Sequence, residues 1–190
     1  MSSTLANLSD GLGQLLLEIA RKSIVSGIKT AEPLAVDPLA FPSELRSCRA
    51  TFVTLHHRGQ LRGCVGGLEP RRELVTDVAM SAFAAAFRDH RLPPVSEDEL
   101  EELEVQISIL SVLEALPADS EEALISKLRP RIDGLVLREG ARQSTFLPSV
   151  WESLPEPAKF LRELKQKAGL APGYWSQTLE FLRYTVEHIP

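Results

Sequence analysis

The heptapeptide Leu61-Arg62-Gly63-Cys64-Val65-Gly66-Gly67 places one cysteine among three glycines, with an arginine two residues before it. A β-strand normally avoids glycine, because glycine loses the most backbone freedom on folding and offers no side chain for packing. The three glycines therefore indicate a close backbone approach or unusual dihedral angles around the thiol. We interpret the pattern as a place where another group approaches Cys64.

The heptapeptide is predicted to form the second strand of a β-hairpin. If the intervening loop pairs His56 with Leu61, then Val53 lies opposite Cys64. Cys48 then lies five residues along the first strand, roughly 16 Å from Cys64, which is too far for a disulfide. A bend before Cys48 would change this register and bring the two thiols together.

Two interpretations of the thiol are open. Strand alternation puts Arg62 and Cys64 on one face, roughly 6.5 Å apart. A guanidinium near a thiol lowers the pKa of that thiol and raises the fraction of thiolate, the form that attacks electrophiles or binds metals. In the alternative interpretation Cys64 is a small apolar side chain packed against Val53, and Arg62 points to water.

A helix predicted over residues 70–87 follows the heptapeptide directly. Its N-terminus is expected near Cys64, where free backbone N–H groups and the positive end of the helix dipole favour an anion or a thiolate. An ordinary strand-turn-helix connection is the alternative.

The remaining periodicity predicts an α+β fold with mainly antiparallel pairing, in which helices flank the sheet. One domain spanning residues 1–190 is expected, because no linker-like tract divides the chain and 44% of its residues are hydrophobic. The other predicted elements are helices over residues 9–28 and 156–168, a strand over 103–113 with a polar face, a hairpin over 132–146 and a final strand over 179–186.

Composition disfavours several classes of protein. The 26 acidic and 21 basic residues give a net charge of −5, and the scattered basic residues argue against nucleic-acid binding. No apolar run is long enough to cross a membrane and residues 1–12 do not resemble a signal peptide, so we expect no membrane partner and a cytoplasmic location. The sequence has no phosphate-binding glycine loop, no three-cysteine cluster motif and no metal-ligand spacing, so neither a cofactor nor a metal is expected.

The heptapeptide resembles the Leu-Arg-Gly-Cys-Ile-Gly motif of the AMMECR family, whose bacterial and archaeal branch is called AmmeMemoRadiSam system protein A. Departures from the family pattern are His90 for proline, Leu92 for an aromatic residue and Gly67 for another small residue. Further matches are Phe52-Val53-Thr54-Leu55, Asp89-His90-Arg91-Leu92-Pro93-Pro94, Leu103-Glu104-Val105-Gln106-Ile107-Ser108, Asp133-Gly134-Leu135-Val136-Leu137, Thr145-Phe146-Leu147-Pro148 and Lys167-Ala168-Gly169-Leu170.

The resemblance implies a larger part with an antiparallel sheet flanked by helices and a smaller part packed against it. It also implies a functional context, because prokaryotic members are associated with a Memo-like protein and a radical S-adenosylmethionine (SAM) enzyme. Any radical chemistry then belongs to such a partner.

The candidate site collects the polar residues of these motifs. Asp89 and Arg91 follow a helix in a proline-stopped turn, where they either pair with each other or offer Arg91 to a carboxylate. Glu104 lies on the polar face of a strand and becomes a general base if it is partly buried. Thr145 offers a hydroxyl to the same cleft.

Two functions from different classes follow. The first is an enzyme or enzyme component in which Cys64 is a nucleophile or redox thiol and Glu104 a base, acting on a small molecule or a modified residue. Its substrate-binding residues would be Arg62, Gly63, Gly66, Asp89, Arg91 and Thr145. The second is a non-catalytic ligand-binding or adaptor module, in which the glycine-rich loop docks a partner and Cys64 is structural.

Overall fold

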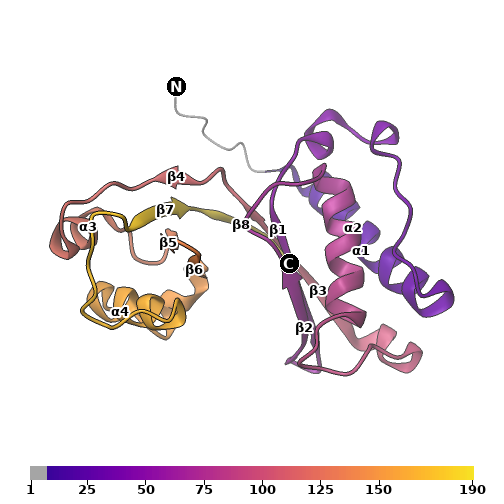
Figure 1. Ribbon diagram of the computed structural model, residues 1–190. Helices are drawn as coiled ribbons and strands as arrows, with labels where there is room; N and C mark the ends of the chain where they lie inside the picture. The colour runs from indigo at the N-terminus through magenta and orange to yellow at the C-terminus, as the bar shows by residue number, and fades with distance from the viewer. Residues whose placement is uncertain (1–7) are drawn as a thin grey trace. The chain divides into compact units, whose positions relative to one another are not determined.

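The computed structural model describes residues 8–190, which form an α+β fold with two antiparallel sheets. The described chain divides into two compact units. The first unit comprises the described residues up to Leu110 together with Glu187–Pro190, and the second unit is Ser111–Val186. Both units are drawn in Figure 1.

The first unit is a four-stranded sheet with two long helices on one of its faces. The strand order is β2-β1-β3-β8, so β2 and β8 are the edges. Figure 1 shows α1 and α2 on the same side of this sheet. The elements are α1 (Asp10–Thr30), β1 (Thr51–His57), β2 (Gln60–Gly66), α2 (Leu74–Phe87), β3 (Leu103–Leu110) and β8 (Val186–Ile189), with 3-10 turns η1 (Pro38–Ala40), η2 (Ser43–Arg46) and η3 (Glu97–Glu102).

Helix α1 confirms the helix expected over residues 9–28. Ser9 occupies the N-cap position, and the helix ends where Ala31 takes a left-handed conformation and donates its N–H to the Gly27 carbonyl. Leu16 and Ile19 are buried at helical spacing and pack on the sheet. Gly27 admits the Phe83 and Phe87 rings of α2, because an added Cβ would overlap them.

Alternation along β1 and β3 separates the core from a second face of the sheet. Val53, Leu55 and Ile107 are fully buried on the side of the helices. Thr54 and Gln106, which lie between core residues along their strands, point to the opposite face and are partly exposed. The predicted polar face of the strand at residues 103–113 is thereby confirmed, although β3 ends at Leu110.

The second unit is another four-stranded sheet, in the order β4-β7-β5-β6. Trp151 is fully buried and stacks on Phe160 with ring centroids 3.8 Å apart, which makes it a core residue. The elements are β4 (Glu114–Ala115), α3 (Glu121–Lys127), β5 (Gly134–Glu139), β6 (Arg142–Phe146), the 3-10 turn η4 (Pro148–Glu152), α4 (Pro157–Lys167) and β7 (Glu180–Tyr184). The hairpin expected over residues 132–146 and the helix expected over 156–168 are confirmed.

The structure corrects two boundaries. The predicted helix at residue 70 begins only at Leu74, because Glu73 forms a β-bridge with Cys48 and Leu74 donates its N–H to the Ser47 carbonyl 2.9 Å away. The predicted strand over residues 179–186 is two strands: β7 belongs to the second sheet, and β8 joins the edge of the first. That residues 1–190 form one domain stays a prediction.

Candidate functional site

Cys64 lies opposite Thr54 on β1, and the predicted pairing with Val53 is wrong. His56 does pair with Leu61, but Leu55 pairs with Gly63, so β2 carries one extra residue at this point. Such a bulge shifts every later pair by one position. It therefore moves the thiol from the core face of the sheet to the opposite, polar face.

The Cys64 side chain belongs to a row of polar side chains, one from each of three neighbouring strands, that crosses one face of the sheet. The Thr54 hydroxyl donates a hydrogen bond to Sγ over 3.4 Å, and Gln106 on β3 is the next residue in the row. Cys64 is partly exposed and, like Cys48, is a free thiol. Glu104 lies on the same face of β3 as Gln106, opposite His56, and its side chain is exposed. The structure thus brings Cys64 and Glu104 to one sheet face in neighbouring rows.

Arg62 is engaged in a separate cluster that fixes β2 to the segment before β3. Its guanidinium forms a two-pronged ion pair with Glu99, over 2.6 and 2.9 Å, and donates to the carbonyls of Pro93 and Pro94 over 2.7 and 2.9 Å. Only 12% of the Arg62 side chain and 16% of the Glu99 side chain are exposed. The hydrogen bonds from Arg62 lower the pKa of Glu99 to about 2. These contacts give Arg62 a structural role.

Asp89 and Arg91 bracket the backbone of Cys64. The Asp89 carboxylate accepts the Cys64 N–H over 3.0 Å, and the Arg91 guanidinium donates to the Cys64 carbonyl over 3.3 Å. The two side chains also form an ion pair of 2.6 Å. Hydrogen bonds from Arg91, followed by the one from the Cys64 N–H, hold the pKa of Asp89 well below its usual range, and Asp89 raises the pKa of Arg91.

Gly63 and Gly66 are required by packing. A Cβ at Gly63 would overlap the carbonyl oxygen of Ala85 in α2, and a Cβ at Gly66 would overlap the Thr51 carbonyl oxygen. The close backbone approach expected from the heptapeptide is therefore confirmed at both positions, and its cause is the fold itself.

The expectation that the N-terminus of α2 lies near Cys64 is wrong. Ala85, near the C-terminal end of α2, touches Gly63, and Asp89, just beyond that end, binds the Cys64 backbone. The N-terminal turn instead reaches the start of β1, where the Thr51 hydroxyl donates to Asp77 over 2.7 Å. The helix end nearer the thiol is thus the one that carries the negative end of the dipole.

Thr145 belongs to the second unit, whereas the other seven candidate residues belong to the first. Its hydroxyl donates to the Leu135 carbonyl over 3.0 Å and shares a 2.9 Å hydrogen bond with the Tyr184 hydroxyl. Burial raises the pKa of Tyr184 to about 12. The Tyr184 ring also covers Gly134, where a Cβ would overlap it. Thr145 thus serves the packing of its own sheet.

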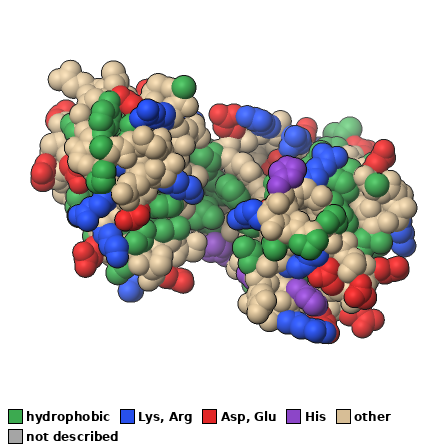
Figure 2. Space-filling model, turned by 60° about the horizontal axis from the view of Figure 1, so that its bottom comes forward, with side chains coloured by type: hydrophobic (Ala, Val, Ile, Leu, Met, Phe, Trp, Pro, Cys, Tyr) green, Lys and Arg blue, Asp and Glu red, His purple; other side chains and the backbone are tan. Residues whose placement is uncertain are grey.

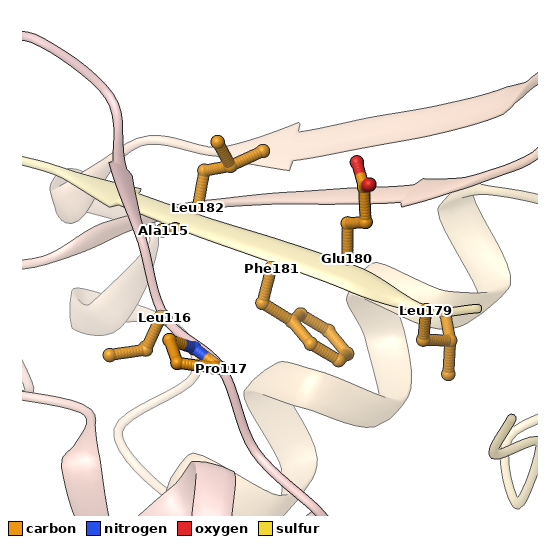
Figure 3. A pocket seen from close by; sticks show the side chains of 7 residues that line it. All are labelled: Ala115, Leu116, Pro117, Leu179, Glu180, Phe181 and Leu182. Atoms are coloured by element: carbon orange, nitrogen blue, oxygen red, sulfur yellow. The ribbon is translucent and has the colours of Figure 1, made fainter. Parts of the chain in front are cut away.

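One apolar pocket of about 290 Å³ lies in the second unit, at the edge formed by β4 and β7. Figure 3 shows the side chains of Phe181 on β7 and of Leu179 just before it on the same side of the strand as Leu116 and Pro117, and none of these residues belongs to the motifs found in the sequence. Within residues 8–190, no group of three or more His, Cys, Asp or Glu side chains is arranged to hold a metal ion. On the face seen in Figure 2, acidic and basic side chains are interspersed.

Sequence reasoning missed Thr54 and Glu99 as partners of the heptapeptide. Thr54 is the polar residue in an otherwise apolar run, Phe52-Val53-Thr54-Leu55, and that interruption is a signal for the second sheet face. Glu99 stands in an acidic run, Glu97-Asp98-Glu99-Leu100-Glu101-Glu102, and no spacing in the sequence links it to Arg62.

Comparison with known proteins identifies the family. A family model described as AMMECR1 matches residues 17–189. The chain belongs to the AMMECR1 family. A relative from Methanothermobacter thermautotrophicus is 35% identical over 172 residues, which cover 88% of this chain and 87% of that protein. A relative from Thermotoga maritima is 39% identical over 149 residues, which cover 77% and 80%.

The AMMECR1 fold is also seen in a solved structure. The crystal structure of the uncharacterized protein PH0010 from Pyrococcus horikoshii matches this chain with a TM-score of 0.85 and 30% identity, covering 95% of this chain and 92% of that one. The match extends over both units of the AMMECR1 chain described here. Among the described residues of this AMMECR1 protein, no helix is long and apolar enough to span a membrane.

Proposed function

We propose that this AMMECR1 protein is an enzyme or enzyme component that uses Cys64 as a nucleophile or redox thiol on a small molecule or a modified residue. The observation that supports this is the polar setting of the sulfur: Cys64 Sγ accepts the Thr54 hydroxyl on the partly exposed, polar face of the sheet. A hydroxyl that donates to sulfur stabilises the thiolate more than the thiol, because the hydrogen bond to the charged form is the stronger one.

The proposed step needs few groups. The Cys64 thiol loses its proton, and the sulfur lone pair forms the new bond to an electrophilic carbon of the substrate, while a π bond at that carbon breaks and its electron pair moves to the neighbouring atom. Glu104, in the neighbouring row of the same face, accepts the proton directly or through water. Residues 1–190 act as one domain in this proposal. A Memo-like protein and a radical SAM protein are the proposed partners, and the radical chemistry belongs to the latter.

Alkylation of Cys64 as a function of pH tests the proposal. Cys48 is a second free and exposed cysteine that would also be alkylated, so the measurement is made in a Cys48→Ser background and read by mass spectrometry. We expect Cys64 to react in the folded protein, and the midpoint of its pH profile is the quantity compared between variants. Thr54→Val, which removes the hydroxyl and keeps the shape, should move the midpoint to higher pH. A thiol that reacts only after unfolding would overturn the proposal.

The adaptor function is favoured by a different observation. The guanidinium of Arg62 and the pair of Asp89 with Arg91 are all engaged in contacts within the protein, as expected if the heptapeptide has a structural purpose. Cys64→Ser separates the two functions, because an adaptor keeps its affinity for the Memo-like protein in a pull-down while an enzyme loses turnover.

A further inference from the structure

Strand β2 is an edge of its sheet, so none of the strands in residues 8–190 pairs with the backbone groups on its outer side. Such edges are normally protected, because free N–H and C=O groups invite pairing with another chain. At Cys64 two side chains protect the edge. The Asp89 carboxylate accepts a hydrogen bond from the Cys64 N–H, and the Arg91 guanidinium donates one to the Cys64 carbonyl. Together the two side chains occupy the positions that a neighbouring strand would fill.

The pair of side chains is itself rigidly held. Asp89 accepts the Arg91 backbone N–H over 3.2 Å and two guanidinium N–H groups over 2.8 and 2.6 Å. Its carboxylate side chain is only 6% exposed, whereas that of Arg91 is 63% exposed. A buried carboxylate that accepts several hydrogen bonds has little freedom to move, so it restrains the residue whose N–H it binds.

The two charges act on the sulfur in opposite directions. A positive charge close to a thiol favours the thiolate, and a negative charge favours the thiol. The Arg91 guanidinium contacts the carbonyl of the very residue that carries the sulfur, and Arg91 interacts electrostatically with Cys64. Asp89 accepts the N–H of the same residue on the same outer side of the strand.

Other charged or titratable groups lie on the same strand or the same sheet face, among them His188 on β8, whose Nδ1 is 3.2 Å from the Ser108 hydroxyl. Arg62 is neutralised by Glu99. Glu104 and His56 lie on the sheet face in the adjacent row, and the C-terminal end of α2 approaches through Ala85. Asp89 and Arg91 therefore remain as the charged side chains that bind Cys64 directly.

We propose that Asp89 and Arg91 are positioning residues for the proposed chemistry of Cys64: they hold its backbone by both hydrogen-bonding groups, and they balance the charge at its sulfur. The inference rests on the proposed function and deepens it, because it assigns to Arg91, and not to Arg62, the positive charge that supports the thiolate. It also replaces a substrate-binding role for Asp89 and Arg91 with a role within the protein.

The test compares three variants in the Cys48→Ser background by the midpoint of the pH profile of Cys64 alkylation. Arg91→Gln should raise the midpoint by about 0.5 to 1 pH unit, and Asp89→Asn should lower it by a similar amount. Arg62→Gln is the matched control, a guanidinium removed from the same strand, and its midpoint should stay within about 0.2 pH unit of the parent. The plateau rate at high pH is recorded separately, because it reports access to the thiol.

Opposite shifts are the distinctive outcome, since loss of a purely structural pair would move both midpoints the same way. Shifts of equal sign, or no shift in either variant, overturn the charge-balancing role. Amide hydrogen exchange supplies a second readout: Asp89→Ala should speed exchange at the Cys64 N–H at least about tenfold in protein that keeps its native circular dichroism, and unchanged exchange overturns the positioning role. If Cys64 is inert in the folded parent, the proposed function fails, and the exchange result still decides whether the pair holds the backbone.

Discussion

Replacing Gly63 with alanine tests whether the heptapeptide owes its glycines to packing. The Cβ of the new residue would overlap the carbonyl oxygen of Ala85 and lie 3.0 Å from its carbonyl carbon. Both atoms belong to the backbone of α2, so the overlap cannot be relieved by turning a side chain. Either β2 or the C-terminal half of the helix has to move.

The expected cost is that of overpacking a filled core. Inserting one methyl group into a packed site costs about 1–3 kcal/mol, and the upper part of that range applies here because the obstacle is backbone. For a chain of this size, 1 kcal/mol lowers the melting temperature by roughly 2–4 °C. Taking about 2–3 kcal/mol, we therefore expect Gly63→Ala to lower the melting temperature by about 4–12 °C.

The matched control is Gly67→Ala, four residues further along in the same heptapeptide. A Cβ at Gly67 meets nothing within 4 Å, and its φ lies outside the left-handed region. This variant should lie within about 0.5 kcal/mol of the parent, or be slightly more stable because alanine restricts the unfolded chain. Thermal and urea denaturation, each followed by circular dichroism, measure the melting temperature and the free energy of unfolding of the two variants. Equal stability of the two variants would refute the packing argument and return Gly63 to the candidates for ligand contact.

Three further outcomes are expected. Because the pKa of Glu99 is lowered, its ion pair with Arg62 contributes its full stabilisation above about pH 4.5, and this stabilisation is lost as the pH falls toward 2. The free energy of unfolding of Glu99→Gln, measured by urea denaturation, should therefore fall less than that of the parent between pH 5 and pH 2. Tyr184→Phe should cost about 1 kcal/mol, because it removes a hydroxyl bonded to the Phe146 carbonyl, and thermal unfolding measures this loss. If residues 1–190 are one domain, unfolding followed by tryptophan fluorescence, which reports only the second unit, coincides with unfolding followed by circular dichroism, and separate midpoints contradict this.

Regular periodicity predicted the local elements well. Helix α1 and the hairpin of β5 and β6 follow from apolar spacing and from turn residues such as Gly140, which takes a positive φ of 58°. The return of the chain to the first sheet was not predictable, because β8 is four residues long and only Thr185 separates it from β7. Only long-range pairing distinguishes the two strands.

The site was harder to predict because a single bulge decides which face carries the thiol. The sequence indicated that Arg62, Asp89 and Arg91 belong with Cys64, and the structure places Asp89 and Arg91 in direct contact with its backbone. Which arginine contacts Cys64 could not be predicted, because no spacing in the sequence reveals the extra residue in β2. Charge partners such as Glu99 are likewise set by tertiary folding.

Three residues of the heptapeptide, Arg62, Gly63 and Gly66, make contacts that are structural, and these contacts do not account for the thiol of Cys64. Arg62 joins β2 to the segment before β3, and Gly63 and Gly66 admit neighbouring backbone. Cys64 differs, because its sulfur faces away from the core and accepts a hydroxyl across 3.4 Å. Cys64→Ser changes one atom and keeps a hydrogen-bonding group at that position, so loss of turnover in a stably folded Cys64→Ser protein would be a property of the sulfur and not of the fold.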